Sequence, residues 1–300
     1  MEVYTKINSL YKRYAFEGKD CPNKDWLKFK NKIILGDFSN IEAKYLFNCP
    51  WEAYSKIDGT NSKIAFFPST QQIVVGGKSN KASSQHGQFE MLQEIGERIK
   101  PQLCEMFPKE CARFVPEKGE NNKVEYWDVT DYLGITTTSP NKEGQYGVWL
   151  KEVPIYIYGE YFGNGIQKCG SRYIKDGNAF RVFDIKQQGW WLPRDIRNSI
   201  CESLELKTVP FLGIMSLKEI EDKVRNGFTT RFENAADATM IEEGIVARPT
   251  VALSDGSGNR IIVKVKHCDY VDYDNVIKDF TDEEFKEFNK WYYTNEEVKR

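Results

Sequence analysis

Short apolar strands dominate the chain from Trp51 onward, and a charged or polar motif falls on or beside most of them. Runs rich in β-branched and aromatic residues predict strands at 62–67, 71–75, 153–162, 180–185, 243–248 and 260–266. Pro68, Ser69 and Thr70 separate the first two strands, which predicts a hairpin. Side chains on a sheet are held by a rigid support, so this pattern favours a site built on strands.

Helical spacing or a capping signature predicts four helices, at residues 88–100, 194–204, 217–226 and 282–291. The third has Ser216 as its N-cap and Glu219 three residues later, which is a capping box. Thr281 and Glu284 give the fourth helix the same start. The sequence contains no internal repeat, and the mixture of strands and helices predicts an α+β fold.

Composition divides the chain into three parts. Residues 1–50 are mixed polar and aromatic and are expected to form an N-terminal extension packed on the core. Residues 51–267 carry the strands and motifs, and 268–300 should form a short helical C-terminal segment. Within the central part, 114–148 is polar and turn-rich, which is typical of an insertion.

Bulk composition excludes several classes of protein. The net charge of −2 excludes a polycation, so a nucleic-acid role must rest on a local basic surface. Seven cysteines form no Cys-x-x-Cys pair, and His86 and His267 carry no ligand pattern, which argues against a zinc site. Scattered cysteines are typical of reduced thiols. With no export signal and no apolar run of 18 residues, we expect a cytoplasmic protein without a membrane partner.

Lys56 stands beside Asp58 and the turn residue Gly59. A lysine in this setting can attack the α-phosphate of a nucleotide and hold the nucleotidyl group through a phosphoamide bond. It must be neutral to attack, and nearby positive charge favours the neutral form. Lys264 and Lys266 lie on one side of a predicted strand and could supply that charge while holding a triphosphate. The alternative is a solvated basic face.

Glu160 and Glu243 are carboxylates beside or within apolar strands. A carboxylate buried there must be paired, hydrogen-bonded or metal-bound. Magnesium is held by one or two carboxylates together with phosphate oxygens and water. Either glutamate could therefore bind a metal, or form a structural ion pair with a lysine. Phe183, on another predicted strand, could stack on a purine or belong to the core.

Taken together, the ordered motifs resemble the covalent nucleotidyltransferases, which are ATP-dependent RNA and DNA ligases and mRNA capping enzymes. The segment 159–168, Gly-Glu-Tyr-Phe-Gly-Asn-Gly-Ile-Gln-Lys, is most similar to the RNA ligase 2 type, and Gly258-Asn259-Arg260 also fits it. The resemblance covers about residues 51–267. It implies an ATP-grasp-like adenylation domain of antiparallel sheets flanked by helices.

The resemblance also implies roles for individual residues. Lys56 becomes the adenylated nucleophile, and Glu243, Lys264 and Lys266 complete the catalytic set. The nucleotide-binding set implied for ATP and AMP is Ser55, Lys56, Ile57, Asp58, Asn61, Lys78, Glu160, Phe183, Glu243, Lys264 and Lys266. Thr60 belongs to the same loop as Lys56. Gln167 and Arg248 would contact the RNA end or a phosphate, and Glu160 and Glu243 would serve a metal.

These features together predict a phage-like ATP-dependent RNA repair ligase that joins 5′-phosphate and 3′-hydroxyl ends. The expected cofactors are ATP and Mg²⁺, with Mn²⁺ as a substitute, and no obligate protein partner is inferred. Asp58 is also found in DNA ligases and capping enzymes, so a DNA ligase or a guanylyltransferase is the alternative. Only 34 residues follow Lys266, fewer than the barrel of those enzymes needs. A catalytically silent nucleotide- or RNA-binding relative is a further alternative.

Overall fold

The computed structural model describes residues 3–78, 87–116, 150–233 and 235–294, so His86 and most of the expected insertion at 114–148 lie outside the described residues. The chain forms two compact units. Residues 60–161 and 180–208, with the first three residues, form the first unit. Residues 4–59, 162–179 and 209–300 form the second.

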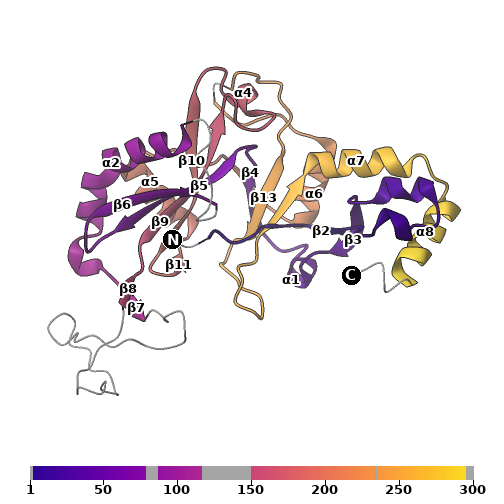
Figure 1. Ribbon diagram of the computed structural model, residues 1–300, viewed down its shortest axis with the longest axis horizontal. Helices are drawn as coiled ribbons and strands as arrows, with labels where there is room; N and C mark the ends of the chain where they lie inside the picture. The colour runs from indigo at the N-terminus through magenta and orange to yellow at the C-terminus, as the bar shows by residue number, and fades with distance from the viewer. Residues whose placement is uncertain (1–2, 79–86, 117–149, 234, 295–300) are drawn as a thin grey trace, which may run out of the picture. The chain divides into compact units, whose positions relative to one another are not determined.

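The first unit contains a five-stranded sheet in the order β11-β10-β9-β5-β6. Its strands are β5 (Thr60–Phe67), β6 (Gln72–Gly77), β9 (Ile155–Gly163), β10 (Asn178–Gln187) and β11 (Trp190–Trp191). The other elements are α2 (Gln88–Met106), η3 (Lys109–Cys111), α5 (Arg194–Ser203) and the small pair β7 (Phe114–Pro116) and β8 (Leu150–Glu152). β5 pairs antiparallel with both β6 and β9. Helix α2 lies along β5 and β6 (Figure 1) and buries Leu92, Ile99 and Leu103 in the core of this unit.

The second unit contains a five-stranded sheet in the order β1-β14-β13-β4-β12. Its strands are β1 (Asn8–Ser9), β4 (Trp51–Ser55), β12 (Phe211–Met215), β13 (Gly244–Pro249) and β14 (Val263–Lys266). β13 pairs antiparallel with β4 and β14, whereas β1 pairs parallel to β14. Helices α6 (Leu217–Asn226) and α7 (His267–Ile277) share one buried cluster with Ala53, Ile245 and Val265. One face of the sheet is therefore core, which leaves the other available for a site.

The first fifty residues are joined to the end of the chain by a second core. They contain β2 (Tyr11–Arg13), η1 (Gly18–Asp20), η2 (Lys24–Phe29), β3 (Ile33–Phe38) and α1 (Ile41–Tyr45). Near the other end lies α8 (Asp282–Thr294), and the short α4 (Gly170–Tyr173) completes the unit. Phe29 stacks on Phe288 with ring centroids 4.3 Å apart, and Tyr14 packs edge-on against Phe288 and Tyr292. These aromatic contacts hold the N-terminal segment against α8.

The elements predicted from the strongest local sequence signals are confirmed. The hairpin is present as β5 and β6, and α6 has the predicted bounds and the capping box of Ser216 and Glu219. The α+β class with antiparallel sheets is also confirmed. Helix α2 was expected to end before Pro101 but continues to Met106, because the buried Leu103 extends its apolar face. β14 is shorter than the predicted 260–266, since residues 260–262 are not paired as a strand.

Two further features concern His267 and the expected absence of a membrane-spanning segment. Nδ1 of His267 lies 2.8 Å from the carbonyl oxygen of Val224, in keeping with a structural histidine. Across the described parts of the chain, no helix combines the length and apolar character that crossing a bilayer requires.

Candidate active site

Lys56 lies immediately after β4, beside the start of β13. Its backbone N–H donates to the carbonyl of Gly244 at 3.0 Å. Its Nζ lies 2.6 Å from Oε2 of Glu243, although the two residues are 187 positions apart in the sequence. The antiparallel pairing of β4 with β13 produces this meeting, because it sets Ser55 opposite Ile245. The structure therefore joins the predicted Lys56 motif to the predicted Glu243 motif.

Glu243 bridges two ammonium groups. Its other oxygen, Oε1, lies 2.6 Å from Nζ of Lys266. The side chains of Glu243, Lys56 and Lys266 are 17%, 20% and 27% exposed, so this triad is only partly solvated. Burial by itself would lower the pKa of Lys266, but the hydrogen bond and the charge of Glu243 outweigh it and raise that pKa. Two lysines and one glutamate leave one excess positive charge, which attracts an anion such as a phosphate.

Lys264 and Lys266 lie on the same side of β14. Val263 and Val265, which alternate with them, are buried in the core cluster, whereas both lysines are partly exposed. This alternation is the period-two pattern of a strand with one buried face. Lys264 is paired in register with Val246 of β13. The predicted arrangement of the two lysines on one face is thus observed.

Arg248 lies further along β13, in a buried ion pair. Its Nε donates to Glu52 at 3.0 Å, and its Nη2 donates to the hydroxyl of Tyr54 at 3.0 Å. That hydroxyl in turn donates to Glu52 at 2.6 Å. The guanidinium also stands 5.0 Å from the centroid of the Tyr54 ring. Its predicted contact with an RNA end or phosphate stays a prediction, and the sequence pattern did not reveal Glu52 or Tyr54 as its partners.

The loop that follows Lys56 is held by a segment that the motifs did not single out. The backbone N–H of Asp58 donates to the hydroxyl of Tyr173 at 3.3 Å, and Oδ2 of Asp58 accepts from the backbone N–H of Cys169 at 3.3 Å. Burial, followed by the charge of Asp58, raises the pKa of the Cys169 thiol. Ile57 is buried, and Gln167 is exposed in the turn that precedes Cys169. The loop after Lys56 is therefore held by two contacts with residues 169–173.

Glu242, next to Glu243, is almost fully buried. One of its oxygens, Oε1, accepts from the Thr230 hydroxyl at 3.0 Å and from the backbone N–H of Arg231 at 3.3 Å. Burial raises the pKa of this carboxyl, and the nearby Glu243 adds to the shift. The hydrogen bonds that it accepts lower the pKa but do not cancel the effect of burial.

The first unit carries another group of predicted residues. Asn61 on β5 is directly opposite Glu160 on β9, so both side chains project from the same face of that sheet. Oδ1 of Asn61 is buried and has no hydrogen-bond partner among the residues that the structure describes. Phe183 on β10 is partly exposed, and its carbonyl accepts a 2.8 Å hydrogen bond from the buried Arg197. Lys78 is exposed just after β6.

The comparison with known families decides what kind of protein carries these groups. The model of the RNA ligase family matches residues 50–266. This chain belongs to the RNA ligase family. The match spans every motif from Lys56 to Lys266 and confirms the resemblance inferred from them.

No curated protein matches this member of the family. Among solved structures it is similar to variants of an RNA ligase from Naegleria gruberi. One, solved with ATP and manganese, has 15% identity and a TM-score of 0.46 over 78% of this chain and 54% of its own. An apo variant has 16% identity and the same TM-score of 0.46, over 80% of this chain and 55% of its own. The chain thus spans about half the length of these structures.

Proposed function

We propose that this protein is an ATP-dependent RNA ligase that joins a 5′-phosphate to a 3′-hydroxyl through a lysyl-adenylate and an adenylated RNA end. The observation that carries the proposal is the position of Lys56, bonded to Glu243 beside Lys266, in a chain of the RNA ligase family. We further propose that residues 51–267 form the adenylation domain. Residues 1–50 and 268–300 are then the segments packed on it.

The donor set of this site fits ATP with a divalent metal ion. Glu243 offers carboxylate oxygens, the ligands that Mg²⁺ prefers, and one or two carboxylates suffice when phosphates supply the remaining ligands. Among the described residues no group of three or more His, Cys, Asp or Glu side chains gathers, which a dedicated all-protein metal cage would need. We propose Mg²⁺, with Mn²⁺ as a substitute, and Glu243 and Glu160 as the residues that serve it. The metal would neutralise charge that develops on the phosphates.

In the first step, Nζ of Lys56 forms a bond to the α-phosphorus of ATP, and the bond to the β-phosphate oxygen breaks. Pyrophosphate leaves, and the amine loses its proton. Glu243 already accepts a hydrogen bond from this nitrogen and so fixes the direction in which it points. Lys264 and Lys266 present positive charge on one face of β14 for the phosphates. The contribution of the chain is mainly position and charge.

The adenylate then passes to the RNA. An oxygen of the RNA 5′-phosphate attacks the phosphorus, and the phosphoamide bond to Lys56 breaks and restores the amine. A 3′-hydroxyl next attacks the 5′-phosphate, loses its proton, and AMP leaves as the strand is sealed. Gln167 and Arg248 are the residues proposed to contact the RNA end or its phosphate.

The first unit is proposed to hold the nucleoside part of ATP. Glu160 would bind the ribose, Phe183 would stack on adenine, and Lys78 would contact a phosphate. The buried and unpartnered oxygen of Asn61, next to Glu160, fits a polar nucleotide group as its partner. The hydrogen bond from Arg197 to the Phe183 carbonyl fixes that part of β10 and so supports a defined position of the ring.

Labelled ATP tests the proposal directly. Incubation of the protein with Mg²⁺ and ATP labelled at the α-phosphate should give an acid-labile covalent adduct. Lys56→Ala should form none, whereas Lys218→Ala, which removes an exposed lysine of α6, should form as much as the parent. Absence of an adduct in the parent, or an adduct in Lys56→Ala, contradicts the proposal. Parallel reactions with GTP, and with nicked RNA and nicked DNA, separate an RNA ligase from a guanylyltransferase and a DNA ligase.

A further inference from the structure

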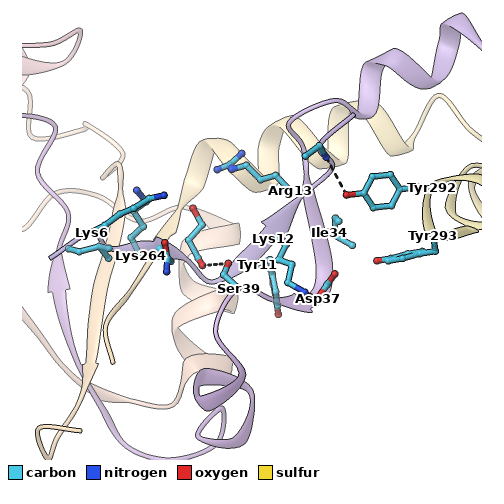
Figure 2. A pocket seen from close by; sticks show the side chains of 14 residues that line it. Lys6, Tyr11, Lys12, Arg13, Ile34, Asp37, Ser39, Lys264, Tyr292 and Tyr293 are labelled. Carbon is cyan, nitrogen blue, oxygen red and sulfur yellow. Dashed lines mark hydrogen bonds and ion pairs between the residues drawn. The ribbon is translucent and has the colours of Figure 1, made fainter. Parts of the chain in front are cut away.

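A groove in the second unit opens beside Lys264. Its volume is about 640 Å³, and it is lined by β1, β2, β3, β14 and the end of α8 (Figure 2). All of its lining residues belong to the second unit. Lys266 follows Lys264 on the same side of β14, roughly 7 Å further along the strand. Lys264 thus places the groove two residues from the lysine that shares Glu243 with Lys56.

The lining of the groove is positively charged. Lys6, Lys12, Arg13 and Lys264 face a single carboxylate, that of Asp37. Lys12 pairs with Asp37 at 2.8 Å, and Arg13 pairs at 2.6 Å with Asp269, which lies outside the lining. The lining itself thus carries four cationic side chains and one carboxylate. In a chain with a net charge of −2, this is a local basic surface of the kind that nucleic-acid binding requires.

A neighbouring hollow does not share this excess of cations. It shares Lys12 and Asp37 with the groove but is also lined by Lys44, Glu42 and Asp255. Its two lysines therefore face three carboxylates. The positive potential thus lies on the side of the N-terminal segment that faces Lys264, and not on the side that faces Asp255.

An exposed aromatic ring lines the same groove, beside Asp37 (Figure 2). Tyr293, near the end of α8, is 44% exposed and lines the groove. Its neighbour Tyr292 is buried, and its hydroxyl accepts from the backbone N–H of Ala15 at 3.3 Å, which fixes this turn of α8 (Figure 2). An aromatic face beside a basic groove is the arrangement on which the bases of a single strand stack.

From these observations we infer that the groove binds the sugar–phosphate backbone of an RNA strand and directs it toward Lys264 and Lys266, with a base stacked on Tyr293. The excess of cations supplies attraction that does not depend on sequence, and the aromatic ring adds a contact that every base can make. The inference rests on the proposed function, since it takes RNA as the substrate. It assigns to the N-terminal segment and α8 the role of a substrate-binding surface.

Paired substitutions test the inference. Lys6→Gln combined with Lys12→Gln removes two exposed charges, and the exposed ion pair of Lys12 contributes little to stability. Lys19→Gln combined with Lys218→Gln makes the same charge change at exposed sites outside the groove. Binding of a labelled 5′-phosphorylated RNA strand is measured by fluorescence anisotropy at several salt concentrations without ATP, and adduct formation with labelled ATP is measured separately.

The Lys6→Gln/Lys12→Gln variant (the groove pair) should reduce the salt dependence of RNA binding. The Lys19→Gln/Lys218→Gln variant (the control pair) should not. Each phosphate contact to a single strand contributes about 0.7 to the slope of log K against log[salt], so the pair should lower the slope by about 1.4. If the plots of log K against log[salt] for the parent and the groove pair meet near 1 M salt, the RNA affinity of the groove pair at 0.1 M salt should be about 25-fold below that of the parent. Tyr293→Leu should weaken binding by about fivefold or more with an unchanged slope. Adduct formation should be unaffected in all of these variants.

The outcomes separate the two proposals. If the parent, the groove pair and the control pair bind RNA with equal affinity and equal salt slope, the groove does not bind RNA and the inference is overturned. The proposed adenylation is unaffected by that result. A groove pair that binds RNA normally but needs more ATP for the adduct shows that the groove holds the phosphates of the nucleotide, which also overturns the inference. Loss of RNA affinity in the groove pair, in a protein that forms no adduct, overturns the proposed function and supports the groove.

Discussion

The buried pair of Arg248 and Glu52 gives a prediction that separates a structural role from contact with RNA. The two side chains are 9% and 10% exposed, and Tyr54 bonds to both. Removal of one partner of a buried pair costs about 3–5 kcal/mol, because the other charge stays buried without compensation. For Glu52→Gln we expect the free energy of unfolding to fall by about 3 kcal/mol. Arg248→Met should lower it by a similar amount, about 3 kcal/mol, because in either variant the remaining charge keeps its hydrogen bond with Tyr54.

The double variant should recover part of this loss. With both charges removed, neither side chain carries an uncompensated charge, so we expect a coupling free energy of about 2 kcal/mol in the double-mutant cycle. Calorimetry of the thermal unfolding of each variant measures this coupling free energy. One kcal/mol shifts the midpoint by about 2–4 °C in a domain of this size, so Glu52→Gln should lower it by about 6–12 °C. Calorimetry is preferred because two compact units can unfold in separate transitions.

A functional measurement completes the design. RNA sealing by each variant is assayed below its unfolding transition, so that any loss of activity is not a loss of folded protein. If Arg248→Met keeps its midpoint within about 1 °C of the parent and yet seals no RNA, the reasoning from the buried pair is refuted. Arg248 would then act on the RNA as the family resemblance implies.

Three further predictions follow from the site. Burial raises the pKa of Glu242 above its ordinary value of about 4.5, so the free energy of unfolding should fall as the pH rises from that value through the raised folded value. Glu242→Gln should remove this fall, and parallel pH profiles of denaturant unfolding for the two proteins would contradict the expectation. A Cβ on Gly244 would lie 1.9 Å from the carbonyl oxygen of Val265, so Gly244→Ala should part β13 from β14, lower the melting temperature and slow adduct formation by at least about tenfold. Gly256→Ala, where a Cβ meets nothing within 4 Å, should change neither, and an unaltered Gly244→Ala would refute the steric argument. EDTA should abolish adduct formation, and Mg²⁺ or Mn²⁺ should restore it; an adduct formed at the same rate in EDTA would contradict a metal requirement.

Features encoded by neighbouring residues could be predicted from the sequence. The bounds of α6 were predictable because Ser216 and Glu219 form a cap within one turn. The hairpin of β5 and β6 was predictable because its turn residues lie between two apolar runs. The family was predictable because its motifs occur in order along the chain, and the match over residues 50–266 confirms it.

Contacts between distant residues could not be predicted in this way. Two residues of β1 pair with β14, and nothing in their own sequence specifies a partner more than 250 positions away. The support of Asp58 by Cys169 and Tyr173 likewise depends on how the loop after Lys56 meets the start and end of α4. The exact pairing of Lys56 with Glu243 required the register of β4 and β13. The catalytic and binding roles of these residues stay predictions.

The parallel pairing of β1 with β14 has a practical consequence for anyone who trims this protein to its family match. Strand β14 carries Lys264 and Lys266, and its outer edge is covered by β1 and Leu10. The N–H of Leu10 donates to the Lys264 carbonyl at 3.0 Å. A fragment of residues 50–266 would lack that cover and would also lose Leu10, Ile33 and Tyr270 from the core cluster. Its bare strand edge and uncovered apolar surface would invite self-association. Intact ends are therefore the safer starting point for biochemical work.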